Sequence, residues 1–257
     1  MIHYIALPIV GLLVGIFIVS LGGGGGAIYV GILMTLFHIS PEVAASTSLA
    51  TMIPTLAAGT YSHWKAGNVN LKLGKYMSAG GIAGVLIGAL LSGMIPAFWY
   101  SKIAGVIFVL LSIQMLVSII GKRKKEQHSA VSQRPFTFWK ICAALAYGVL
   151  GGVMCGLLGL SGGGPIVAGL FVLGSSMTES AGTSVFVLTA LSIVGLLMHL
   201  SLGNIDWGLV GLLLLGTVMG ALIGPVFMKH VNKNLLEHIL QPVMFVLIFV
   251  MGAVLIL

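Results

Sequence analysis

The sequence LGGGGGAIYVGILMTLF, residues 21–37, places five consecutive glycines inside one of the most apolar parts of the chain. Glycine is a poor helix former, at about 1 kcal/mol per residue relative to alanine. It also has no side chain to bury. The run therefore predicts a break in the helical path, with a long helix before it and a short apolar helix after it.

The composition is typical of an integral membrane protein. Of the 257 residues, 58% are hydrophobic and only 7% are charged, whereas about 25% of the residues in a soluble domain are charged. The apolar stretches are about 18 to 22 residues long, as an α-helix needs to cross ~30 Å of hydrocarbon. The short alternating segments of a β-barrel are missing. We therefore expect an all-α polytopic membrane protein in the lipid bilayer.

The charged residues and cysteines predict no further partner. The net charge of +7 comes from lysines and arginines in short loops beside apolar spans, where they set membrane orientation. No nucleic-acid partner is expected. Cys142 and Cys155 both lie in apolar segments, so they predict neither a disulfide framework nor a metal site. We also expect no cofactor.

The chain repeats itself. LSGGGPIVAGLFVL, from Leu160, resembles the first glycine-rich stretch. Later matches keep a constant offset of 136 residues: Thr47 with Thr183, His63 with His199, Asn68 with Asn204, and Gly80, Gly84 and Gly88 with Gly216, Gly220 and Gly224. We therefore predict a first transmembrane repeat at 1–121, a basic linker at 122–137 and a second transmembrane repeat at 138–257.

Each repeat is expected to contain four long helices and one short half-helix. The expected helices are 2–21, 27–37, 43–62, 76–91 and 103–120, then 138–159, 165–173, 179–200, 207–227 and 235–257. The short segments 27–37 and 165–173 would reach only about 16 and 14 Å. We therefore expect the glycine-rich breaks, called here the first tip (22–26) and the second tip (159–164), to lie near mid-membrane.

The basic residues favour an inverted repeat. With inverted halves and both termini outside, eleven of the twelve lysines and arginines are cytoplasmic, and only Lys102 is outside. With parallel halves, the number falls to nine. Because cytoplasmic loops are rich in Lys and Arg, we expect the linker to lie in the cytoplasm. The protein itself is expected in the plasma (inner) membrane. Inverted repeats are common in secondary transporters.

The tips are predicted to bind an anion. Non-helical backbone at membrane depth must be buried or line a wet cavity, and a helix N-terminus presents free N–H groups and a positive dipole end. The charged residues of the expected spans, Lys140, Glu179 and Glu237, lie within three residues of a span end, so hydroxyls would supply the other donors at mid-depth. The predicted substrate-binding residues are Gly22, Gly23, Gly24, Gly25, Gly26, Ser46, Thr47, Ser48, Ser161, Gly162, Gly163, Gly164, Thr183 and Ser184. Alternatively, the hydroxyls bond to their own helices.

Two other groups of residues have competing interpretations. His63 and His199 are candidates for proton coupling, because histidine titrates near neutral pH; interfacial anchoring or capping is the alternative. The glycines at four-residue spacing, such as Gly80 and Gly84, favour tight helix packing rather than a site.

These features together resemble the sulfite exporter family (TauE/SafE, also called toluene sulfonate uptake permeases). The resemblance covers nearly the whole chain and rests on the two halves, each with a glycine-rich motif, then STS (Ser46 to Ser48) or GTS (Gly182 to Ser184), then a GN turn. It implies a plasma-membrane carrier for a small sulfur-containing anion such as sulfite, thiosulfate or sulfoacetate. It also implies export that uses the membrane potential or a proton gradient.

Two other functions remain open from the sequence. An anion channel would use the same backbone dipoles in a continuous pore. An intramembrane serine protease of the rhomboid type is suggested by GLSGG at 159–163, with Ser161 as nucleophile and His199 as base; the first half carries only glycine at the matching position. We expect a transporter and no enzyme. The sequence does not predict the oligomeric state.

Overall fold

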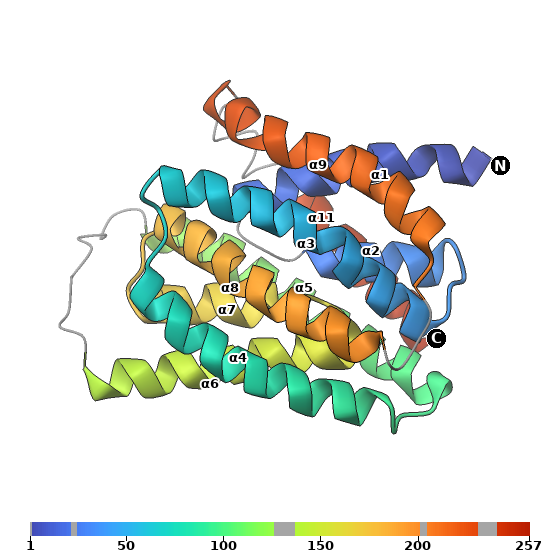
Figure 1. Cartoon of the computed structure of the whole chain (residues 1–257), viewed down its shortest axis with the longest axis horizontal. Coiled ribbons are helices and arrows are strands. Elements are labelled where there is room, and N and C mark those ends of the chain that lie inside the picture. The colour runs from blue at the N-terminus through green and yellow to red at the C-terminus, as the bar shows by residue number, and fades with distance from the viewer. Residues whose placement is uncertain (1, 22–24, 126–136, 201–204, 231–240) are drawn as a thin grey trace.

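The computed structural model describes residues 2–21, 25–125, 137–200, 205–230 and 241–257, and every regular element in these ranges is a helix. Figure 1 shows long helices lying side by side in one bundle. They are α1 (Ile2–Leu21), α2 (Gly25–Thr35), α3 (Pro41–Lys65), α4 (Leu71–Ser92), α5 (Ala97–Lys125), α6 (Phe138–Leu158), α7 (Gly163–Val172), α8 (Met177–His199), α9 (Trp207–His230) and α11 (Gln241–Ile256). The prediction of an all-α protein is confirmed.

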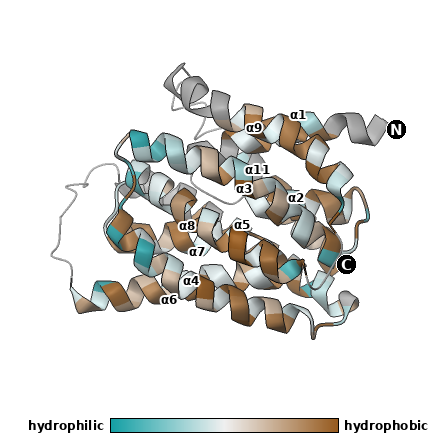
Figure 2. Ribbon diagram, in the orientation of Figure 1, coloured by the Kyte–Doolittle hydropathy of each residue, from teal (hydrophilic) through white to brown (hydrophobic). Residues whose placement is uncertain are grey.

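The helices have the length and composition of membrane spans. Three are long and apolar enough to cross a membrane by themselves, over Leu71–Ser92, Phe138–Leu158 and Thr178–His199, and six other helices carry shorter apolar segments. Figure 2 shows hydrophobic residues along most of the bundle. The chain is a polytopic membrane protein.

Two predicted helix starts are wrong by five or six residues. Helix α4 begins at Leu71, not at 76, because the Asn70 side chain accepts a hydrogen bond from the backbone N–H of Leu73 and caps the helix. Helix α5 begins at Ala97, not at 103, directly after Pro96. The first five residues of α4 include Lys72 and Lys75, and a search for apolar stretches discards such a start. Helix α5 begins with apolar and aromatic residues, but Ser101 and Lys102 interrupt its apolar run before 103. The Asn70 cap, not the hydropathy, determines the start of α4.

Glycines allow close backbone contacts between helices of the bundle. Cβ atoms added to Gly80, Gly84 and Gly88 of α4 would lie closer than 3.0 Å to the backbone carbonyl oxygens of Leu145, Val149 and Val153 in α6. Gly216 and Gly220 of α9 pack in the same way on the Pro8 and Leu12 carbonyls of α1. Only hydrogen fits at these positions, so the packing interpretation is confirmed for them. Because the residue numbers rise together, α4 runs parallel to α6 and α1 runs parallel to α9.

Helices at matching places in the two halves run in opposite directions. Leu49 of α3 faces Gly195 of α8, and Thr60 further along α3 reaches Thr189 earlier on α8, so these two helices are antiparallel. Figure 1 shows the same for α1 and α6. We call the end of the bundle where α4, α6 and α8 begin the linker end. The opposite end, where α3 and α9 begin and the N and C labels lie in Figure 1, is the terminal end.

Candidate functional site

The second tip is a tight left-handed turn between α6 and α7. Gly159 ends α6 with φ 68°, Ser161 follows with φ 55°, and Gly162 caps α7 with φ 69°. Only glycine adopts this region without strain. Gly162 also packs so closely on the Gly151 carbonyl that a Cβ would overlap it. The glycines are needed at this turn for both reasons.

Helix α7 begins level with the middle of α4. Gly162 packs on Gly151 of α6, and the adjacent Gly152 packs on Gly81. Gly81 is the eleventh residue of the 22-residue helix α4. The N–H groups at the start of α7 therefore lie at about half the length of a full span, where they have a positive dipole end and few alternative partners.

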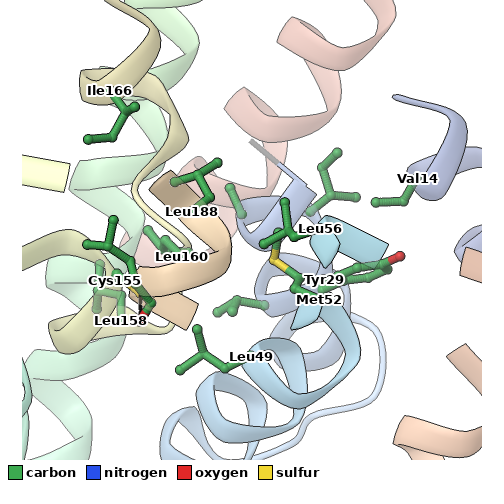
Figure 3. Close-up of a cluster of buried hydrophobic side chains, with 14 of the residues drawn as sticks. Val14, Tyr29, Leu49, Met52, Leu56, Cys155, Leu158, Leu160, Ile166 and Leu188 are labelled. Carbon is green, nitrogen blue, oxygen red and sulfur yellow. Dashed lines mark hydrogen bonds between the residues drawn. The ribbon is translucent and has the colours of Figure 1, made fainter. Parts of the chain in front are cut away.

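The two tips meet inside the bundle. A Cβ on Gly26, in the first turn of α2, would lie 2.8 Å from the carbonyl carbon of Leu160 in the second tip. The Ser48 hydroxyl of α3 donates to the Gly26 carbonyl at 3.5 Å. Figure 3 shows Leu160 among buried side chains from both halves, including Met52 and Tyr29. Gly22, Gly23 and Gly24 lie outside the described residues.

Ser161 is an unusual residue of the second tip. It is fully buried, and its hydroxyl has no hydrogen-bond partner among the described residues. It also holds a left-handed backbone conformation that a non-glycine residue seldom adopts. A buried donor without a partner costs about 1–3 kcal/mol, and backbone strain of this kind often marks a functional position. Ser161 is therefore the strongest candidate for contact with a ligand.

Gln114 is a site residue that the sequence analysis missed. Its side-chain amide, on α5, donates to the carbonyl of Gly164 at 3.1 Å. Gly164 belongs to the first turn of α7, so Gln114 fixes the start of this half-helix. The available signal was a polar amide within the apolar stretch SIQMLV, which is costly in a membrane unless it has a role.

The hydroxyls of Thr47 and Thr183 bond to backbone N–H groups outside the tips. The Thr183 hydroxyl accepts from the backbone N–H of Asn70 at 2.9 Å, and the Thr47 hydroxyl accepts from that of Asp206 at 3.4 Å. Since α3 and α8 are antiparallel, the two threonines lie roughly 20 Å apart along the bundle. Each instead joins its own half to the start of a helix from the other half.

Ser46 and Ser184 use their hydroxyls on their own helices. Ser46 Oγ donates to the Glu42 carbonyl at 2.9 Å, and Ser184 Oγ donates to the Ala181 carbonyl at 2.9 Å. These bonds fit the alternative interpretation of the hydroxyls. The remaining predicted tip residues, Gly25 and Gly163, are buried in the first turns of α2 and α7.

The two histidines lie in different surroundings. His199, at the end of α8, is buried, and its Nε2 is 2.8 Å from the Gly156 carbonyl of α6. His63 is half-buried in the last turn of α3. Proton coupling by either residue stays a prediction. The His199 ring nitrogen is engaged by a carbonyl, and the Ser161 hydroxyl has no bond to it, so the nucleophile and base of a protease are not paired.

The comparisons with known proteins identify the family. The family profile described as "Sulfite exporter TauE/SafE" matches residues 7–255. The chain belongs to this TauE/SafE family. It is 31% identical over 227 residues to a "Probable membrane transporter protein YdhB" of Bacillus subtilis (strain 168), covering 88% of this chain and 90% of that protein. It is 26% identical to YjnA of the same strain, also named a probable membrane transporter, covering 96% and 98% of the two chains.

Family membership confirms the resemblance seen in the sequence. The TauE/SafE match and the names of the relatives make this chain a membrane transporter rather than an enzyme, and nothing supports the protease alternative. No solved structure matches the chain significantly.

Proposed function

We propose that this TauE/SafE protein is a secondary carrier that exports a small sulfur-containing anion, such as sulfite, thiosulfate or sulfoacetate, from the cell. The anion is held where the two tips meet. The observation that carries the proposal is Ser161 in the strained turn directly before α7, because its buried hydroxyl has no hydrogen-bond partner in the described part of the chain. The family name supports a sulfur oxyanion as the class of substrate.

The chemistry of this region suits an anion that must also leave. The free N–H groups at the start of α7 and the Ser161 hydroxyl are neutral donors, and the nearby Gln114 is an amide. Neutral donors stabilise an oxyanion through dipoles. A fixed lysine or arginine would bind it more strongly and slow its release. A site of moderate affinity fits transport better than storage.

The antiparallel halves support alternating access. In inverted-repeat carriers, one half rocks against the other around a site at mid-depth. The contact between Gly26 and Leu160 lies between the halves, where such a movement would expose the site to either side. A carrier saturates with substrate and shows counterflow, whereas the alternative channel requires a continuous pore.

Substitution of Ser161 by alanine tests the site. A hydrogen bond to a charged group contributes about 1.5–3 kcal/mol, so Ser161→Ala should weaken anion binding roughly ten- to a hundredfold. Binding of sulfite, thiosulfate and sulfoacetate to the purified protein would be measured by calorimetry. Ser112→Ala is the matched control, because the buried Ser112 hydroxyl donates to the Val109 carbonyl of its own helix. If Ser161→Ala bound the anions as tightly as Ser112→Ala, Ser161 would not belong to the binding site.

Cysteine labelling tests the proposed orientation, with the linker end in the cytoplasm. Lys65 and Met94 are exposed at the linker end and the terminal end. In a background carrying Cys142→Ala and Cys155→Ala, we expect an impermeant maleimide to label Met94→Cys in intact cells. Lys65→Cys should react only after the membrane is permeabilised. The reverse pattern would place the terminal end inside.

A further inference from the structure

Asn70 joins the two halves at the linker end with three hydrogen bonds. Its side-chain Oδ1 caps α4 by accepting from Leu73, and its backbone N–H donates to the Thr183 hydroxyl. Its side-chain Nδ2 donates to Glu179 Oε1 at 2.6 Å. Thr183 and Glu179 belong to α8, in the other half. One residue therefore both starts a helix and links it to the opposite half.

Asp206 holds the corresponding position at the terminal end. It lies 136 residues after Asn70, the same offset that relates Thr47 to Thr183. Asp206 Oδ1 accepts from the backbone N–H of Leu209 and caps α9, while its own N–H faces the Thr47 hydroxyl. The cap and the threonine contact are thus present twice, once at each end of the bundle.

The contacts at the two ends differ in length and in the number of hydrogen bonds. The distance from the backbone nitrogen to the threonine oxygen is 2.9 Å for Asn70 and 3.4 Å for Asp206. Moreover, an aspartate carboxylate has no N–H, so Asp206 cannot reproduce the side-chain donation that Asn70 makes to Glu179. The linker-end contact is short and reinforced, and the terminal-end contact is long and single.

We propose that these contacts are two latches that hold the two ends of the transporter closed in turn. The linker-end latch is Asn70 with Thr183 and Glu179, and the terminal-end latch is Asp206 with Thr47. Opening the linker end separates α4 from α8, and opening the terminal end separates α9 from α3. The Asn-to-Asp difference biases the resting protein toward closure at the linker end. The role in transport rests on the proposed carrier function, but the latches themselves do not.

Asn70→Asp isolates the latch from the helix cap. The aspartate keeps the oxygen that caps α4 and loses the amide that binds Glu179. Ser180 and Ala44 serve as probes, because both are buried and lie 136 residues apart on α8 and α3. In the background without native cysteines, we expect Asn70→Asp to raise the maleimide reaction rate of Ser180→Cys about tenfold. The rate of Ala44→Cys should fall.

Two further variants keep the test decisive. Glu179→Gln, added to Asn70→Asp, restores a donor–acceptor pair with the roles exchanged and should return the Ser180→Cys rate toward its original value. Asp206→Asn keeps the α9 cap, adds a donor at the terminal end and should slow Ala44→Cys further. Rates that rise together at both ends, or that do not change at either, would overturn the latches. The assay uses no substrate, so its result is independent of anion binding by Ser161.

Discussion

Gly162→Ala is expected to lower transport at least tenfold while the protein still inserts into the membrane. Gly162 has φ 69°, where an L-residue costs about 1–2 kcal/mol. Its new Cβ would also overlap the backbone carbonyl of Gly151, which cannot rotate away as a side chain can. The second tip must therefore move, and Ser161 and the start of α7 move with it. Flux of labelled sulfite into inside-out vesicles would measure the loss.

Gly164→Ala provides the matched control two residues away. A Cβ on Gly164 meets only the side chains of Leu111 and Gln114, at 2.7 and 3.0 Å. Both side chains are flexible, so we expect a reduction of only about two- to threefold, which is less than 1 kcal/mol. If Gly162→Ala transported as well as Gly164→Ala, the geometry of the second tip would not matter for transport.

Gly216→Ala is expected to destabilise the whole bundle. A Cβ on Gly216 of α9 would overlap the carbonyl of Pro8 in α1. Both groups are backbone, so the two parallel helices must separate along their interface. Overpacking of this kind costs about 1–3 kcal/mol or more. We expect the unfolding midpoint of the purified protein in detergent to fall by roughly 5 to 10 °C.

Gly211→Ala is the control on the same helix. Nothing lies within 4 Å of a Cβ on Gly211, and the residue is exposed. Alanine forms helix better than glycine by about 1 kcal/mol, so this variant should be as stable as the parent or slightly more stable. If the unfolding midpoint fell by a similar amount in Gly216→Ala and Gly211→Ala, the decrease would not come from overpacking of the α1–α9 contact.

The path of the chain was largely predictable from the sequence, whereas the helix ends were not. Helix α1 has the bounds that its apolar run predicts, and the short helices α2 and α7 follow the glycine-rich stretches. The start of α4 was missed because its first residues include two lysines, and the start of α5 was missed because Ser101 and Lys102 interrupt its apolar run. A hydropathy pattern reports which residues face lipid or core, and a capped polar turn faces neither.

The candidate site was predictable only in outline. The glycines of the second tip were found because consecutive glycines are improbable in a span unless the backbone must turn. The sequence did not distinguish the roles of the hydroxyls. Ser161 has no partner within the described ranges, Ser184 bonds its own helix and Thr183 bonds Asn70. All three are small hydroxyl residues in apolar surroundings. Their neighbours in sequence do not distinguish them, because whether a hydroxyl meets a distant backbone group, as Thr183 meets Asn70 across 113 residues, is decided by folding.

By itself, the sequence determined the membrane environment, the helical class and the family, because these depend on composition, period and order along the chain. The tertiary structure alone decided which donors have partners. Gln114 reaches Gly164 across 50 residues, and Asn70 reaches Thr183 across 113. A hydrogen bond acts over about 3 Å, so its partner depends on which helices become neighbours and in which direction they run.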